Sequence, residues 1–466
     1  MLRLVELNVA TSAAYAALSD SWRAQRLPDS LPQFIVGTST DMAPEVREET
    51  GRRVAESKTG LFDTHPCDTD RIRAAEALDA PGVFRSTDAA SALFRDFASL
   101  SRQVTRLSYE KDQALPIQDA NLVDTETYLR ETSALRATRA LSERYFGGVS
   151  TLLHPISIGL ADLQPLLGPD ADLAELRSAQ ERMKAVVNRA RYAQKQQKQI
   201  GELRFNAENA LVLLTAGFAI EPARFGLKAA TPGAANEAIA TLEGERQQSG
   251  APLVEYSARA GARLRAALRQ LNSPSRARRI ADAQVLQEEV TRLVPALEVL
   301  APALLLLQAL GGKLSPWQML LVSRGHQAEP AKVDAVIDEL AGELRGLVGQ
   351  VTCCITGISY PFPHARGAIT LDQFVKPDAP SLEEHEALFG ECLACLDRLY
   401  PLYEEVLGRL AQIAARVEET LALETAPGKD VAGAPAGDLM ARLREVASRL
   451  GPEALAARRP SAGTRA

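Results

Sequence analysis

Apolar side chains recur three and four residues apart along much of the chain, which is the spacing of one face of a helix. The clearest series lies in residues 87–110 and steps by four, three, four and three through Leu93, Phe97, Leu100, Val104 and Leu107. This heptad spacing places all five side chains on a single stripe. The polar cluster Ser86, Thr87 and Asp88 is predicted to cap the helix at its start.

A second heptad-like seam runs through Leu173, Leu176, Met183, Val187 and Ala190, within a helix predicted over 171–221. Stripes of this kind belong to a buried core more often than to a seam for a partner protein. Both seams are therefore predicted to pack inward. Binding of a partner along the stripes is the alternative interpretation.

The remaining chain shows the same preference for helices. Ala, Leu, Arg and Glu are abundant, whereas aromatic residues make up only 5%, and this mixture favours helices over sheets. Residues 358–380 are irregular and contain β-branched residues that predict a short strand or hairpin at most. Further helices are predicted over 4–22, 44–58, a short stretch from about Asp68, 127–145, 234–249, 254–271, 276–310, 330–350, 381–424 and 438–450.

The predicted fold is all-α and multi-helix. Its predicted parts are an N-terminal helical segment at 1–75, a helical connection at 76–117, helical domains at 118–330 and 331–450, and a tail at 451–466. The most apolar runs, residues 299–312 and 209–220, are too short to span a bilayer. Both runs are predicted to be buried helices.

Composition narrows the classes of function. The chain has 466 residues, 53 basic and 59 acidic, with a net charge of −6, so its charge gives no support to nucleic-acid binding. Its five cysteines, an odd number without framework spacing, suit a reducing compartment. The first residues contain Arg3 and Glu6 and do not resemble a signal peptide. A cytoplasmic location is expected for the chain as it stands.

Few motifs carry recognisable chemistry. The chain contains no H-E-x-x-H, G-x-S-x-G, P-loop or G-x-G-x-x-G sequence, so neither a zinc protease site, a hydrolase nucleophile nor a nucleotide site is indicated. Cys392 and Cys395 form one C-x-x-C on a predicted helix, and a structural zinc site would need two more ligands, for which Cys353 and Cys354 are the candidates. Two small buried helix cysteines are the preferred interpretation. No cofactor is predicted in this chain.

The stretch "TGLFDTHPCDTDRI" (59–72) interrupts the helices with a turn. Pro66 keeps His65 out of the helical conformation, and Asp68 is a good N-cap for a helix beginning near Thr69. Arg71 then projects from the first turn of that helix. His65 and Arg71 are candidates for a catalytic pair that stabilises an oxyanion. A capped turn with a surface histidine is the alternative.

The pattern T-H-P-x-x-x-x-R-I, formed by Thr64, His65, Pro66, Arg71 and Ile72, resembles the late motif of the HtpX-like and CAAX-prenyl-protease-like membrane zinc metallopeptidases. The surrounding segments at 21–35 and 44–49 are similar to a long bacterial branch of that family. The resemblance extends over about the first 110 residues. It implies that His65 and Arg71 line the substrate cleft and that a large helical region follows the peptidase core.

The resemblance also implies a missing part. In that family the zinc histidines, the general-base glutamate and the third-ligand glutamate precede this motif, as do transmembrane helices. Three protein ligands and a water are needed for the zinc chemistry, so the chain is expected to be the C-terminal portion of a metalloendopeptidase, inactive alone. Its partners would be a peptide or protein substrate and the N-terminal membrane part, which would make it membrane-associated. The alternative is a stand-alone helical scaffold that binds a protein partner.

Overall fold

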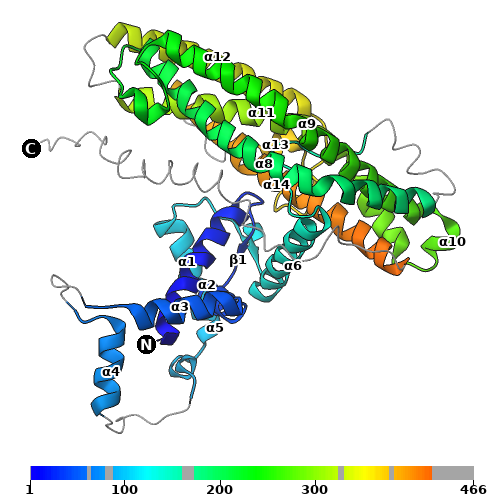
Figure 1. Ribbon diagram of the computed structural model, residues 1–466. Helices are drawn as coiled ribbons and strands as arrows, with labels where there is room; N and C mark the ends of the chain where they lie inside the picture. Colours follow the sequence, from blue (N-terminus) through cyan, green and yellow to red (C-terminus); the bar gives the residue numbers. More distant parts are fainter. Residues whose placement is uncertain are drawn as a thin grey trace, which may run out of the picture. The chain divides into compact units, whose positions relative to one another are not determined.

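The computed structural model of the chain describes residues 2–59, 65–78, 88–159, 173–323, 330–376 and 383–421. These residues are mostly helical and contain very few strand residues, which confirms the predicted all-α, multi-helix class (Figure 1). They form two compact units. Unit 1 comprises residues 1–139 and 348–406, and unit 2 comprises residues 140–347 and 407–466. Each unit thus joins segments distant in sequence, whereas the predicted divisions near 75, 117 and 330 follow the order of the chain.

Unit 1 is built from short helices and one two-stranded parallel pairing. The strands β1 and β2 align Leu27 with Leu122 and Pro28 with Val123. Residues 358–370 contribute only an isolated antiparallel bridge between Ser359 and Thr370, which agrees with the predicted short strand or hairpin. The elements are α1 (Leu2–Trp22), β1 (Leu27–Pro28), α2 (Leu31–Thr40), α3 (Pro44–Glu56), α4 (Asp68–Leu78), α5 (Phe97–Leu107), β2 (Leu122–Val123), α6 (Thr125–Tyr145) and α13 (Leu371–Phe374), with short 3-10 turns at Ala90–Leu93 and Asp119–Asn121 and a π turn at Ser108–Asp112.

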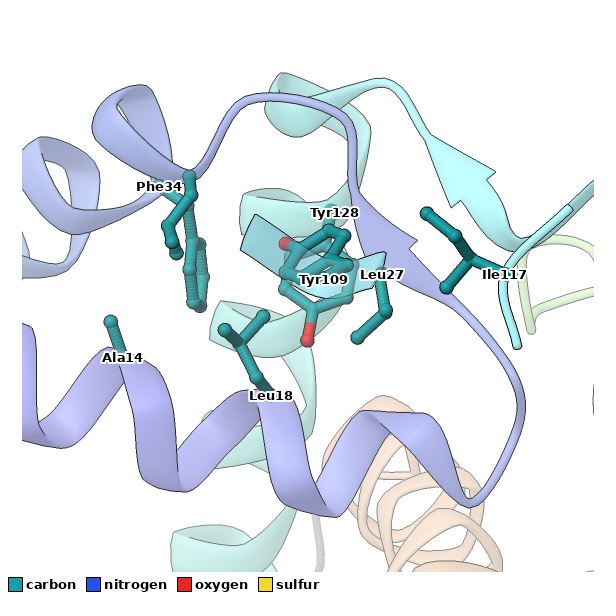
Figure 2. Packing of buried hydrophobic residues seen from close by; sticks show 8 residues of the cluster. Ala14, Leu18, Leu27, Phe34, Tyr109, Ile117 and Tyr128 are labelled. Carbon is teal, nitrogen blue, oxygen red and sulfur yellow. The ribbon is translucent and has the colours of Figure 1, made fainter. Parts of the chain in front are cut away.

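The core of unit 1 gathers around α1, α2 and the π turn after α5. Figure 2 shows Leu18, Phe34 and Tyr109 turned toward one another above α1. Phe34 and Tyr128 meet edge to face with ring centroids 5.0 Å apart. The buried members of this cluster are Ala14, Leu18, Leu27, Leu31, Phe34, Tyr109, Ile117 and Tyr128. Because these residues come from segments a hundred positions apart, their burial fixes where α5 and α6 lie against α1 and α2.

Unit 2 consists mainly of long helices. Its elements are α8 (Leu173–Thr215), a 3-10 turn at Pro222–Phe225, α9 (Pro232–Arg269), a 3-10 turn at Gln270–Asn272, α10 (Pro274–Ala277) and α11 (Ala283–Ser323). Three helices span the sequence boundaries at 139/140, 347/348 and 406/407 and so belong in part to each unit: α6, α12 (Pro330–Ile355) and α14 (Glu384–Thr420).

Two helix ends predicted within unit 2, near residues 249 and 310, are wrong. The helices predicted at 234–249 and 254–271 are one continuous helix, α9, with Pro252 inside it. Likewise α11 continues through Pro295, Pro302 and Pro316 to Ser323, beyond the predicted end at 310. A proline removes one backbone hydrogen-bond donor and bends a helix. The turns on either side of it can still form one continuous helix when they are packed against neighbouring elements. The helix predicted over 438–450 lies outside the described residues.

The packing of unit 2 follows the apolar faces of its helices. α8 runs against α9, and α11 contacts α8. Leu300, Leu304 and Leu307 of α11 are fully buried, so the apolar run at 299–312 is a core helix as predicted. Gly261 of α9 marks a close approach, because a Cβ there would lie 2.3 Å from the carbonyl oxygen of Ser157. Only glycine fits at this crossing.

A buried ion pair lies inside unit 2, between Arg263 of α9 and Glu418 of α14. The guanidinium donates through Nε at 3.0 Å and through Nη2 at 2.6 Å to the two carboxylate oxygens. The side chains are 2% and 0% exposed. The hydroxyl of Tyr145 donates to the same carboxylate at 3.0 Å, and its ring lies 3.9 Å from the guanidinium carbon. Burial raises the pKa of Tyr145 well above its ordinary value, so the phenol remains a donor.

Candidate functional site

The two predicted apolar seams have opposite surroundings. In α8, Leu176, Met183, Val187 and Ala190 are buried, as predicted, and Leu173 at the start of the seam is half-buried. The seam of α5 faces solvent instead, and the prediction that it packs inward is wrong. On α5 the exposed fractions are 40% at Phe97, 39% at Leu100, 51% at Val104 and 54% at Leu107. Leu93, which ends the preceding 3-10 turn, is 85% exposed, and Phe94 in the extended link to α5 is 47% exposed.

The helix α5 is turned outward because its polar face supplies the inner contacts. Ser101, Thr105 and Tyr109 follow one another at four-residue intervals and are 4%, 1% and 1% exposed. The Oγ atoms of Ser101 and Ser30 share a hydrogen bond of 2.9 Å. The backbone nitrogen of Leu31 donates to Thr105 Oγ1 at 2.8 Å. Thr105 thus accepts from one of the backbone N–H groups at the start of α2 that have no partner within that helix.

Two further contacts complete this polar layer. Tyr109 donates through its hydroxyl to the carbonyl oxygen of Pro28 at 3.0 Å. The backbone nitrogen of Ser30 donates to Thr125 Oγ1 at 2.9 Å, and that hydroxyl donates to Asp29 Oδ1 at 2.7 Å. A buried polar group is tolerated when its hydrogen bonds are made. The hydroxyl face of α5 and of the π turn after it is thus hydrogen-bonded to β1 and to the start of α2, and the apolar face of α5 lies outside.

The N-cap of α5 also differs from the predicted one. Asp96 accepts from the backbone nitrogen of Ser99 at 2.9 Å, and the regular helix begins at Phe97. Of the predicted capping cluster, Ser86 and Thr87 lie outside the described residues, and Asp88 stands in the bend before the 3-10 turn. The Asp96 carboxylate is stabilised at this position by the unpaired amides of the first turn.

One end of the seam opens into a groove between α1, α2 and α5, of about 440 Å³. Its walls are mostly apolar, with Tyr15 from α1, Leu31 and Ile35 from α2, and Val104 and Leu107 from α5. Lys111 and Asp112 stand at the margin, where the π turn ends the helix. A concave apolar wall with polar groups at its edge has the form of a site for an apolar ligand or helix. We call the exposed seam and this groove together the α5 groove.

The charges beside the α5 groove are partly neutralised within unit 1. Arg106 donates to Glu110 at 3.0 Å and to Asp119, and these hydrogen bonds raise the pKa of the Arg106 guanidinium. Arg102 lies 3.9 Å from Asp29. Ion pairs at the surface contribute little stability, but they hold these side chains along the edge. The seam itself contains only apolar residues.

The predicted catalytic pair lies elsewhere on unit 1. His65 and Arg71 are both exposed, and Arg71 is 3.8 Å from Asp68 on its own helix turn. Thr59 ties the turn together, because its hydroxyl donates to Asp70 at 2.5 Å and accepts from the backbone nitrogen of Cys67 at 2.8 Å. The hydrogen bonds that the Asp70 carboxylate receives, first the one from Thr59, lower its pKa. The turn and the helix near Asp68 agree with the sequence interpretation, except that Asp68 is the first residue of α4 rather than its N-cap. Thr64 lies outside the described residues.

The cysteines on α14 and α12 differ in their burial. Cys392 and Cys395 are buried on α14, and burial raises the pKa of each thiol to about 12. Cys353 is exposed and Cys354 half-buried on α12. Zinc binds thiolates, and the described part of the chain holds no group of three or more His, Cys, Asp or Glu placed to share a metal. These residues do not by themselves fit a zinc site, either at the C-x-x-C or beside His65.

The helix α11 has a segment apolar enough to cross a membrane by length and composition alone. The mean hydropathy of that 18-residue window is 2.0, and 56% of it is buried inside the protein. The core helix of a globular unit meets the same criterion. Among the described helices, α11 is the one that meets this criterion of length and composition.

Sequence reasoning found the seam of α5 but missed the hydroxyl face opposite. The signal was present as Ser101, Thr105 and Tyr109 at spacing i, i+4 and i+8. Comparison with known protein families, with curated proteins and with solved structures finds no match to this chain. The function is therefore argued from the residues of the site.

Proposed function

We propose that this chain is a helical scaffold that binds a protein partner through the α5 groove. One observation carries the proposal. α5 buries its hydroxyl residues and turns its apolar residues to solvent, so that Thr105 is 1% exposed while the adjacent Val104 is 51% exposed. An amphipathic helix that packs against a hydrophobic core ordinarily buries its apolar residues and exposes its polar ones.

The size of the exposed surface supports the proposal. Four apolar side chains on α5 itself, Phe97, Leu100, Val104 and Leu107, are each exposed by 39% or more, and together they present on the order of 300 Å² of apolar surface. The largest apolar patch on an ordinary monomer is of this order and is often functional. Scattered exposed residues such as Tyr192 and Val254 of unit 2 do not form such a row along one helix.

The shape of the α5 groove favours a helix as the bound element. Val104 and Leu107 line one wall, and Leu31 and Ile35 line the other. A partner helix would place residues spaced three and four apart against the seam, which is the helix-in-groove mode of recognition. Apolar contacts in the middle of the groove would supply the affinity, and the charged margin would set orientation.

The experiment is photo-cross-linking in the cells that make this protein. A photoreactive phenylalanine analogue replaces Leu100 in the seam, or Tyr192 of α8 as the control, which is 67% exposed. The proposal expects polypeptide adducts from position 100 that are absent from position 192. The same pattern of adducts from both positions, or none from position 100, would contradict it.

A second candidate follows from the T-H-P-x-x-x-x-R motif. The chain would be the C-terminal portion of a zinc metalloendopeptidase, with His65 and Arg71 near the substrate and the metal held by a preceding part. His65 just before α4 and Arg71 in its first turn support this candidate, because the two residues are close along the chain. It remains a prediction, and its test is given in the Discussion.

A further inference from the structure

A non-helical segment of unit 2 lies between two turns that are made by glycines. Residues 149–158 contain neither helix nor strand. They follow Gly147 and Gly148, whose φ angles are +64° and +68°, and they precede Gly159, whose φ angle is +82°. Glycine adopts these left-handed angles without steric cost, so the chain can change direction at both ends of the segment. We call residues 149–158 the strap.

Side chains of three helices hold the main chain of the strap. They contact alternate residues from 150 to 154 and then residue 158. The hydrogen bonds join Ser150 N to Gln194 Oε1 of α8 at 2.9 Å, Gln308 Nε2 of α11 to Leu152 O at 2.8 Å, Ser257 Oγ of α9 to His154 O at 2.7 Å, Ile158 N to Glu298 Oε1 of α11 at 2.6 Å, and Arg265 Nη1 of α9 to Ile158 O at 3.1 Å. Each bond uses a backbone group of the strap, so it does not depend on which side chain that residue carries.

The side chains at the end of the strap alternate between buried and exposed. Ile156 and Ile158 are 0% and 2% exposed, whereas Ser157 between them is exposed. The hydroxyl of Ser157 donates to Glu298 Oε2 at 2.6 Å. Gly261 of α9 leaves room for the carbonyl oxygen of Ser157 at this point. Alternation of this kind is the pattern of an extended chain that lies with one face against a surface.

Main-chain hydrogen bonds combined with pockets for alternate side chains are the means by which proteins bind extended peptides. We infer that α8, α9 and α11 form a groove for an extended peptide and that the strap is its occupant within the same chain. The helices make their own backbone hydrogen bonds, and α8 and α9 pack along each other. The strap can therefore leave as one piece by rotation at the glycines, and a partner segment can take its place.

The contacts of the strap define the chemistry of that partner segment. Two β-branched apolar residues separated by one residue would enter the places of Ile156 and Ile158. The residue between them would face outward beside Glu298, as Ser157 does. A hydroxyl or a basic side chain suits that position, whereas an acidic one would be repelled by the carboxylate. The strap belongs to unit 2, so the inference is independent of the α5 groove.

The first test measures binding of a fluorescent peptide with the sequence of residues 151–159, TLLHPISIG, to the full chain by anisotropy. The strap competes with the peptide in the wild type. Ile156→Ser should loosen the strap and raise the affinity for the peptide by roughly tenfold or more, because a larger fraction of the grooves is open. A peptide with serine in place of both isoleucines should not bind. The matched control is Ile280→Ser, which alters another buried isoleucine of unit 2 and should leave the affinity unchanged.

The second test loosens the strap without removing a buried side chain. Ser157→Asp places a carboxylate beside Glu298 and should raise the affinity for the peptide, whereas Ser157→Asn, which is uncharged and of the same size as aspartate, should raise it less. Hydrogen exchange of the full chain, followed by mass spectrometry, should accelerate in the strap of Ser157→Asp and stay unchanged in α8 and α9.

The results that would overturn the inference are distinct from these. One is an affinity for the peptide that is the same in the wild type, Ile156→Ser and Ser157→Asp. Another is hydrogen exchange in Ser157→Asp that accelerates in the strap and in the helices alike. A third is an Ile156→Ser chain that does not fold, since the strap would then be an inseparable part of the core of unit 2.

Discussion

Val104 and Thr105 are neighbours in sequence and have opposite surroundings. Val104 is 51% exposed, whereas Thr105 is 1% exposed and accepts a hydrogen bond of 2.8 Å from the backbone nitrogen of Leu31. Thr105 therefore contributes to folding at the start of α2. Val104 contributes to the surface that we propose for partner binding.

Removing the cap of α2 should destabilise unit 1. Ser30 accepts at 3.4 Å from the backbone nitrogen of Gln33 and contacts Ser101. Ser30→Ala should lower the free energy of unfolding by about 1–2 kcal/mol, the usual cost of losing a buried cap. Urea denaturation followed by the fluorescence of Trp22, with Trp317 replaced by Phe, reports on unit 1.

The control for this prediction is Ser12→Ala. Ser12 bonds the carbonyl oxygen of Asn8 within α1 and is exposed, so its loss should change the free energy of unfolding by less than about 0.5 kcal/mol. Equal effects of the two substitutions would show that the hydroxyl layer beneath α5 is not what holds α2.

Much of the fold could be predicted from periodicity, because most helices carry an apolar face. Periodicity identifies a face but not what that face meets, and for this reason the seam of α5 was assigned to the core. The partners of Thr105 lie 74 residues away at Leu31. The break predicted between residues 249 and 254 contains Pro252, a residue that local propensity disfavours inside a helix, and the packing of α9 overrides this preference.

The ion pair of Arg263 and Glu418 could not be predicted either, since it joins residues 155 positions apart. Arg263→Met leaves the Glu418 carboxylate buried without its cation and should lower the free energy of unfolding of unit 2 by about 3–5 kcal/mol. The double variant Arg263→Met with Glu418→Leu should recover most of that loss, because it removes both charges.

The measurement for the ion pair is urea denaturation followed by Trp317, which is buried and donates to the carbonyl oxygen of Ile337 at 3.1 Å. Trp22 is replaced by Phe in all these proteins. Arg409→Met with Glu289→Leu, which removes a half-buried pair held at 2.5 and 2.7 Å, is the matched comparison. A double variant at Arg263 and Glu418 as unstable as Arg263→Met alone would contradict the electrostatic explanation.

Stability should fall in alkaline solution because tyrosines are buried. Burial raises the pKa of Tyr109 above its ordinary value of 10.0, so the folded protein keeps the proton while the unfolded chain releases it. The contribution is fully present below pH 10 and is lost as the pH rises further, by about 1.4 kcal/mol per pH unit for each such tyrosine.

Tyr109→Phe tests this effect. The variant should lose about 1 kcal/mol at pH 8 with the hydrogen bond to Pro28. Above pH 10 its free energy of unfolding should decline less steeply than that of the wild type. Equal slopes for the two proteins between pH 9.5 and pH 11 would refute the assignment; the pH values are chosen to bracket the ordinary tyrosine pKa of about 10.

The peptidase candidate makes a separate prediction for His65 and Arg71. In a protein that also carries the zinc-binding part, His65→Ala or Arg71→Ala should lower peptide turnover by roughly two to three orders of magnitude. Folding should be unchanged because both side chains are exposed. The control is Arg73→Ala, an exposed arginine two positions along the same helix. Turnover equal to that of the control would leave the segment as a capped turn.

The most direct test of the account compares Val104→Gln with Thr105→Val by urea denaturation at submicromolar concentration, with Trp22 as the reporter of unit 1. The account predicts a change below about 0.5 kcal/mol for Val104→Gln, which alters only an exposed side chain. It predicts a loss of about 1–3 kcal/mol for Thr105→Val, which leaves the buried Leu31 amide without an acceptor. A large loss for Val104→Gln with none for Thr105→Val would place the apolar seam in the core and contradict the proposed binding surface.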